Sequence, residues 1–148
     1  MGIITDKERI DEALELLWVL EEEGHTEVDR FSLSSDDAEI GPLIETLKQD
    51  GLASIAEGEI RLTERGRKIA KGLIRRQRLA ERLFTDVFEM PEDTVLNDAC
   101  KMEHILSEEL TESVCIFLGH PPTCPHGKPI PPGECCEEGV TTLAITCW

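Results

Sequence analysis

The chain has 148 residues, of which 40% are hydrophobic and 31% are charged. This size suits one compact unit or two small lobes and excludes two full-sized domains. Its 31 acidic and 15 basic residues give a formal net charge of -16. A surface this acidic repels nucleic acid and anionic membranes, so the overall charge argues against a DNA partner.

The hydrophobic and cysteine patterns bear on the cellular compartment. No apolar stretch approaches the roughly 20 residues needed to cross a bilayer, and the N-terminus lacks the hydrophobic region of a signal peptide. We therefore expect a cytoplasmic protein with no membrane partner. All six cysteines lie in the last third of the chain, whereas a secreted disulfide framework would staple the whole of a small domain. This distribution favours reduced thiols that bind metal.

Helical periodicity and turn residues predict three short helices in the first part of the chain. A capping box at Thr5–Glu8 begins the first helix, and Gly24 ends it. Residues 28–33 are ambiguous between helix and strand. A further helix opens at Gly41–Pro42 and continues to Gly51.

The middle of the chain predicts a two-stranded hairpin, called the wing below, followed by longer helices. Two short strands within 52–62 flank a glycine-containing turn. A long helix then runs from Thr63 to about Phe88, and its solvated face carries most of the positive charge: residues 61–82 hold nine basic and two acidic side chains. Only this segment can meet phosphates without large repulsion. After Pro91, we expect a helix over Thr94–Leu110 and a last short one that Gly119 closes.

The segment after Gly119 is rich in proline, with six prolines between Pro121 and Cys135. Such a stretch cannot form a helix. We expect a loop ordered by something other than backbone hydrogen bonds, and a metal is one candidate. Residues 140–148 have the composition of a single added strand.

The element order predicts a mainly α fold, with a winged helix-turn-helix domain followed by a helical dimerisation domain. Four segments carry a closer resemblance: 62–66 (LTERG), 78–83 (RLAERL), 99–104 (ACKMEH) and 125–131 (PHGKPIP). With them the chain resembles, over roughly residues 8 to 132, the iron- and manganese-dependent repressors of the diphtheria toxin repressor family. Larger members continue into an SH3-like domain, which we expect a chain of this length to be too short to hold.

This resemblance implies three segments and a set of partners. We expect a winged-helix DNA-binding domain at 1–72, a helical metal-binding and dimerisation domain at 73–120, and a Pro/Cys-rich tail at 121–148. The implied function is that of a homodimeric, iron-sensing transcriptional regulator that binds a double-stranded DNA operator and is not an enzyme. The chain has no nucleotide-binding glycine loop and no tyrosine, so a redox enzyme has no support beyond the thiols.

Cys100, Glu103 and His104 have the i, i+3, i+4 spacing that places a thiolate, a carboxylate and an imidazole in one region of a helix. On spacing alone, a buried cysteine beside a solvated Glu–His pair is an open alternative. The resemblance implies the family's effector site for Fe2+ or Mn2+. The family adds a ligand from the first helix, where this chain carries Glu12 or its neighbour Asp11.

The family's second, ancillary metal site is altered in this sequence. Glu81 is retained, but Gln77 and Leu96 occupy positions where relatives carry histidine. We therefore expect the ancillary site to be absent and Glu81 to be a helix-surface partner of Arg78 or Arg82.

The cysteines of the tail predict a further inorganic centre. An oxygen-sensitive iron–sulfur cluster is the favoured interpretation; zinc, held by Cys124, His126 and two further cysteines, is the alternative; free thiols in a structural turn are the third. Adjacent Cys135 and Cys136 seldom bind one ion together. The predicted cluster ligands are Cys124, Cys135 and Cys136, with Cys115 or Cys147 as the fourth.

The segment that would read DNA departs most from the family. Acidic Glu39 and Glu45 flank Gly41–Pro42 where relatives present polar, uncharged side chains, and acids oppose contact with base edges and phosphates. A metal- or redox-sensing partner protein that has lost DNA binding is therefore the rival function. The predicted phosphate contacts are Arg61, Arg65, Arg67 and Lys68.

Overall fold

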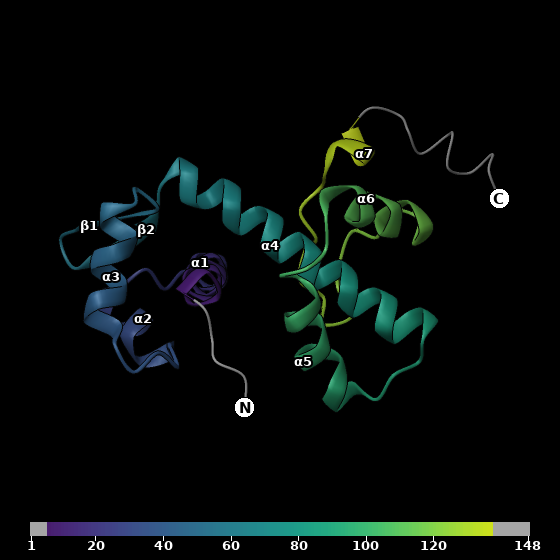
Figure 1. Ribbon diagram of the computed structural model, residues 1–148, viewed down its shortest axis with the longest axis horizontal. Helices are drawn as coiled ribbons and strands as arrows, with labels where there is room; N and C mark the ends of the chain where they lie inside the picture. The colour runs from purple at the N-terminus through teal and green to yellow at the C-terminus, as the bar shows by residue number, and fades with distance from the viewer. Residues whose placement is uncertain (1–5, 138–148) are drawn as a thin grey trace. The chain divides into compact units, whose positions relative to one another are not determined.

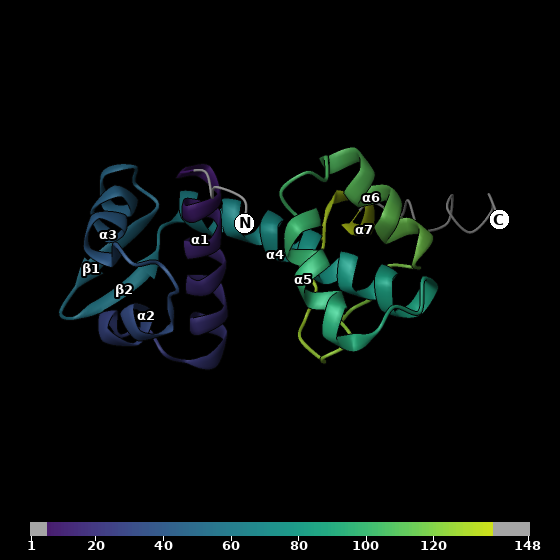
Figure 2. The ribbon, with the colours of Figure 1, turned by 60° about the horizontal axis from the view of Figure 1, so that its bottom comes forward.

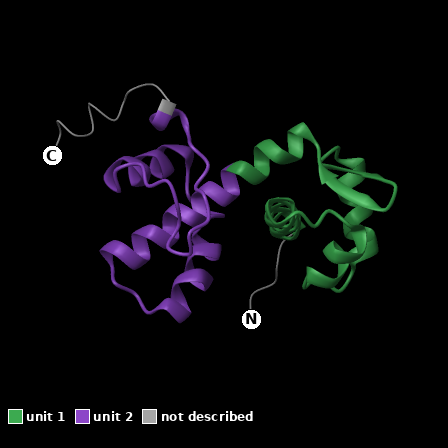
Figure 3. Ribbon diagram, turned by 180° about the vertical axis from the view of Figure 1, so that it is seen from behind, with its two compact units in different colours: residues 1–71 green, residues 72–148 purple. Residues whose placement is uncertain are grey.

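The computed structural model describes residues 6–137 of the chain. The polypeptide divides into two compact units, 1–71 and 72–148 (Figure 3). The predicted cap at Thr5, the strand expected over 140–148 and the candidate ligand Cys147 lie outside the described residues. None of the described helices combines the length and the apolar character needed to span a membrane.

The first unit contains three helices and a hairpin, as the sequence predicts (Figure 1). Its elements are α1 (Asp6–Glu23), α2 (Val28–Ser34), α3 (Ile40–Gln49), β1 (Ala53–Ala56), β2 (Glu59–Leu62) and the start of α4 (Glu64–Arg82). The ambiguous segment 28–33 is thus helical. Each element contributes to the core, because α1 packs on α2 and β2 while α3 packs on β1 (Figure 2). Fully buried side chains include Leu14, Leu17, Phe31, Leu47 and Ile60.

The wing is a two-stranded antiparallel hairpin in which Ala53 pairs with Leu62 and Ile55 with Ile60. Its two turn residues, Glu57 and Gly58, both have positive φ values of 52° and 78°. A two-residue turn with this backbone matches the right-handed twist of the flanking strands.

The LTERG segment joins the wing to α4. The Thr63 hydroxyl accepts a hydrogen bond from the Gly66 N–H at 3.0 Å and donates to the Gly51 carbonyl at 2.6 Å. Gly66 lies directly against the Leu52 carbonyl, where any β-carbon would overlap the backbone. These contacts fix the start of the long helix to the residues just before β1.

The second unit continues α4 through a π-helical turn, η1 (Leu83–Val87), into α5 (Glu92–Met102), α6 (Glu108–Phe117) and α7 (Glu134–Glu137). The predicted long helix is confirmed. The single helix expected over Thr94–Leu110 is wrong, because it is interrupted between Met102 and Glu108. Ser107 explains the restart: its side chain accepts from the Leu110 N–H at 3.0 Å, and acidic residues follow in the first turn.

The proline-rich segment is ordered by its own backbone hydrogen bonds as well as by arginines of α4. The Cys124 N–H donates to the Lys128 carbonyl at 2.8 Å and the Ile130 N–H to the Pro122 carbonyl at 2.9 Å, so the expectation that something other than backbone hydrogen bonds orders this loop is wrong. Arg78 donates to the Pro129 carbonyl at 2.6 Å, and Arg82 donates to the Thr123 carbonyl at 2.7 Å. The prolines prevent helix up to Pro132, but α7 forms directly after Gly133. The expectation that the whole segment lacks helix is therefore wrong at Cys135 and Cys136, which lie on this short turn.

Candidate metal centres and DNA-contact surface

The predicted effector-site residues lie at the end of α5 and just beyond it. Cys100 is in the last helical turn, whereas Glu103 caps the helix and His104 follows it. Glu103 is 1% exposed, and its Oε1 lies 3.4 Å from His104 Nε2. The Cys100 thiol accepts from the Gln77 amide at 3.4 Å. A buried carboxylate next to an imidazole is thus in place, although the two are not on a continuous helix as the spacing suggested.

The fourth predicted ligand belongs to the first unit. Glu12 lies on the exposed face of α1, while its neighbour Asp11 is 5% exposed and pairs with Lys7 at 2.8 Å. Because the other three residues belong to the second unit, the role of Glu12 stays a prediction.

Glu81, Cys124 and His126 form a donor group whose ligand atoms all lie within 4.8 Å of one another. His126 Nδ1 is 3.1 Å from Glu81 Oε1. Burial raises the pKa of Glu81, and the neighbouring His126 opposes that shift. The expectation that Glu81 lies on the helix surface is wrong: its side chain is 4% exposed, because the loop that carries His126 lies over it.

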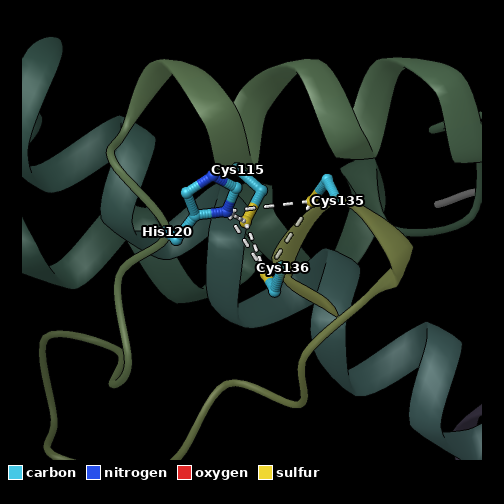
Figure 4. Close-up of side chains that lie close together, drawn as sticks. All are labelled: Cys115, His120, Cys135 and Cys136. Atoms are coloured by element: carbon cyan, nitrogen blue, oxygen red, sulfur yellow. Dashed lines mark hydrogen bonds between the residues drawn. The ribbon is translucent and has the colours of Figure 1, made fainter. Parts of the chain in front are cut away.

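Cys115, His120, Cys135 and Cys136 form a second group of donors within 4.8 Å (Figure 4). Cys115 comes from α6, His120 from the loop after Gly119, and the adjacent cysteines from α7. The Sγ atoms of Cys115 and Cys136 are 3.6 Å apart, and those of Cys135 and Cys136 are 3.8 Å apart. His120 Nδ1 lies 3.3 Å from Cys115 Sγ, 3.3 Å from Cys136 Sγ and 3.9 Å from Cys135 Sγ.

The thiols of this second group differ in acidity. Burial, together with the neighbouring thiols, raises the pKa of Cys115 to about 12. Burial also opposes ionisation of Cys136, but the Gly133 backbone and hydrogen bonds from His120 and the other thiols lower its pKa to about 7. Cys136 is therefore the thiol of the three that ionises most easily.

The sequence predicted three members of this group and missed one. Cys124 lies with Glu81 and His126 instead of with the other tail cysteines. His120 was not singled out; the available signal was a histidine directly after the glycine that closes α6, five residues beyond Cys115. It has a φ of 54°, and its N–H bonds the Cys115 carbonyl at 2.8 Å, which turns the chain back toward the thiol.

The four predicted phosphate-contacting residues are all exposed at the wing and the start of α4. Arg61 pairs with Glu59 at 3.1 Å, Arg67 pairs with Glu21 at 2.7 Å, and Arg65 donates to the Asp50 carbonyl at 2.9 Å. Exposed pairs of this kind are weak and exchange readily for a phosphate.

The exposed face of α3 carries Glu45, Thr46 and Gln49, while Leu43 and Leu47 face the core. Glu45 is partly neutralised by Lys48 at 3.5 Å.

Residues 63–132 match the family model described as the iron dependent repressor, metal binding and dimerisation domain. This part of the chain matches the metal-binding and dimerisation domain of that family. The iron-dependent repressor domain therefore includes Glu81, Cys100, Glu103 and His104, and it ends just before Cys135 and Cys136. The latter two cysteines lie outside the matched residues.

Relatives extend the likeness to the winged-helix unit. The chain is 37% identical over 123 residues to the iron-dependent repressor IdeR of Mycobacterium tuberculosis, covering 80% of this chain and 53% of that protein. It is 32% identical over 123 residues to the diphtheria toxin repressor of Corynebacterium diphtheriae, covering 80% and 54%. The chain thus spans about half the length of the curated relatives that it matches.

Solved structures agree on the fold. A manganese-dependent transcriptional repressor in complex with manganese superimposes with a TM-score of 0.74 at 28% identity, over 84% of this chain and 59% of that one. The IdeR of T. acidophilum gives a TM-score of 0.65 at 26% identity, over 88% and 61%. The predicted mainly α fold, a winged helix followed by a dimerisation domain, is confirmed.

Proposed function

We propose that this chain is a homodimeric, metal-dependent transcriptional repressor that binds double-stranded DNA. The observation that carries the proposal is a winged-helix unit with four exposed basic side chains at the wing and the start of α4, followed by residues that match an iron-dependent repressor domain. The acidic remainder of the surface repels DNA, so Arg61, Arg65, Arg67 and Lys68 concentrate the favourable contacts at the wing.

Fe2+ or Mn2+ is the proposed effector, held by Cys100, Glu103 and His104 with Glu12 as the fourth ligand. A divalent cation offsets the cost of burying the Glu103 carboxylate beside His104. A carboxylate such as Glu12 is a hard ligand that favours iron or manganese over softer ions. Metal binding stabilises the conformation of the chain that holds the ion best, and we propose that this is the conformation that binds DNA.

The tail is proposed to hold an inorganic centre as well. The sequence favours an iron–sulfur cluster there, with zinc as the alternative. A cluster places iron and sulfide between cysteines that ligate different irons, whereas three thiols and an imidazole of this chain converge on one point (Figure 4). The spacing of these donors supports a single ion over a cluster.

A metal-sensing partner protein that does not bind DNA is the second candidate function. Glu45 on the exposed face of α3 favours it, since an acid there opposes contact with phosphates and with most base edges.

Selection from a random-sequence duplex pool separates these two functions. With Mn2+ present, we expect enrichment of a partly palindromic site, as a symmetric dimer requires. The selected duplex should lose affinity when EDTA is added. Failure to enrich any sequence at low salt, with the protein folded and loaded with Mn2+, would favour the partner-protein function.

A further inference from the structure

The donors of the second group have the spacing of ligands around one ion. Tetrahedral zinc with Zn–S bonds of about 2.3 Å holds its thiolates about 3.8 Å apart. The Sγ separations of 3.6 and 3.8 Å and the shortest Nδ1–Sγ separations of 3.3 Å are close to that geometry. Adjacent cysteines seldom share an ion, but the α7 turn here points both thiols at Cys115 and His120 (Figure 4).

Arg75 of α4 supplies a second, independent observation. The residue is 8% exposed, and its Nη2 donates to Cys135 Sγ at 3.2 Å. Gly133 lies against the same guanidinium, where a β-carbon would come within 2.5 Å of Arg75 Cζ. Three thiolates and a neutral imidazole around a divalent ion carry a net charge of about -1, and a buried guanidinium offsets that charge.

We propose that Cys115, His120, Cys135 and Cys136 bind one zinc ion, with Arg75 as the positioning residue that balances the charge of the site. The ion ties α7, which lies beyond the residues matched to the iron-dependent repressor domain, to α6 and the loop after it, and Arg75 links the site to α4 through Cys135. Its role is structural, because four protein ligands leave no open position. The site is separate from the proposed effector residues and does not depend on DNA binding.

Metal analysis of the unmodified chain and three variants tests this assignment. We expect about one zinc per chain after dialysis against a weak chelator, and loss of that zinc in Cys136→Ser and His120→Ala. Cys100→Ser is the matched thiol variant and should keep the zinc while losing affinity for Mn2+. Zinc retained in Cys136→Ser, or lost in Cys100→Ser alone, would overturn the assignment. Failure of the effector proposal would instead show as unchanged Mn2+ affinity in Cys100→Ser.

Cobalt substitution keeps the test valid if these variants fail to fold. Co2+ bound to the unmodified chain should give the intense visible bands of a tetrahedral ion and thiolate charge-transfer absorption for three sulfur ligands. Arg75→Gln should weaken zinc binding about 10- to 100-fold and shift that charge-transfer band, with partial recovery in Arg75→Lys. Octahedral cobalt spectra, or iron with acid-labile sulfide in protein purified without oxygen, would overturn the zinc assignment, the latter in favour of a cluster.

Discussion

Asp37 connects α1 to the segment that begins α3. Arg9 donates to its carboxylate from Nε at 2.7 Å and from Nη2 at 3.0 Å, and the Glu39 N–H donates at 2.8 Å. The hydrogen bond from Arg9, followed by that from the Glu39 amide, lowers the pKa of Asp37. A lowered folded-state pKa contributes stability above the unfolded pKa of about 3.9, and this contribution is lost as the pH falls through the folded value.

Asp37→Asn should therefore reduce the free energy of unfolding at pH 7, and the difference from the unmodified chain should shrink as the pH is lowered below about 4. Urea unfolding followed by circular dichroism across this range measures it. Asp36→Asn, at the exposed neighbouring position, is the control. A difference that stays constant with pH would show that the carboxylate charge is not the source.

His104 tests the effector site at the level of one side chain. His104→Ala should weaken Mn2+ binding at least tenfold, because it removes an imidazole beside the buried Glu103 carboxylate. Calorimetric titration of Mn2+ measures the change, with His25→Ala in the first unit as the control. Equal affinities for the two variants would remove His104 from the site.

The sequence, read with the family resemblance, named candidate donor residues more completely than it grouped them into sites. Cys100, Glu103 and His104 were selected by spacing and resemblance, and Cys135 and Cys136 by composition. The partners His120 and Arg75 come from other segments of the chain, and only the path of the loop after α6 brings them together with α7. Cys124 shows the converse, because its closeness in sequence to the other tail cysteines does not place it with them.

At the scale of elements, the contact between Gly66 and the Leu52 carbonyl holds α4 to the wing. Gly66→Ala should lower the free energy of unfolding by about 3 kcal/mol, the upper end of the usual overpacking cost, because the obstacle is backbone. Gly41→Ala is the matched substitution, since no atom lies within 4 Å of the added carbon. It should leave stability unchanged or raise it by up to about 1 kcal/mol. Similar effects of both substitutions in urea unfolding would contradict the structure.

Elements with strong local signals were predictable from the sequence. The wing has a two-residue turn ending in glycine, and α4 has a long amphipathic pattern. The break between α5 and α6 was missed because the helical spacing of hydrophobic residues continues across it. The signal for the new helix is its N-cap, Ser107, and one residue is easily overlooked. The short α7 was missed because the prolines that exclude a helix all lie before Gly133, and the same exclusion was extended to the residues after it.

For the whole molecule, the central expectation is a dimer formed through the second unit. This unit exposes several large apolar side chains, among them Ile105 (76%), Leu110 (50%) and Phe117 (47%), which a partner would cover. Sedimentation at micromolar concentration should give about twice the 16.6 kDa monomer mass. Phe117→Glu should shift the chain toward monomer, whereas Leu33→Glu, at a site in the first unit that is 86% exposed, should not. A clean monomer for the unmodified chain would contradict the dimer.

The proposal that metal controls DNA binding is tested most directly by measuring the reverse effect, which is the effect of bound DNA on metal affinity. If Mn2+ strengthens DNA binding by some factor, bound DNA must strengthen Mn2+ binding by the same factor. The measurement is calorimetric titration of Mn2+ into the free chain and into its complex with the selected duplex. We predict tighter Mn2+ binding in the complex, by about 5- to 150-fold for a typical coupling energy, and no such gain in His104→Ala. Equal Mn2+ affinities for the free and DNA-bound chain would contradict the account.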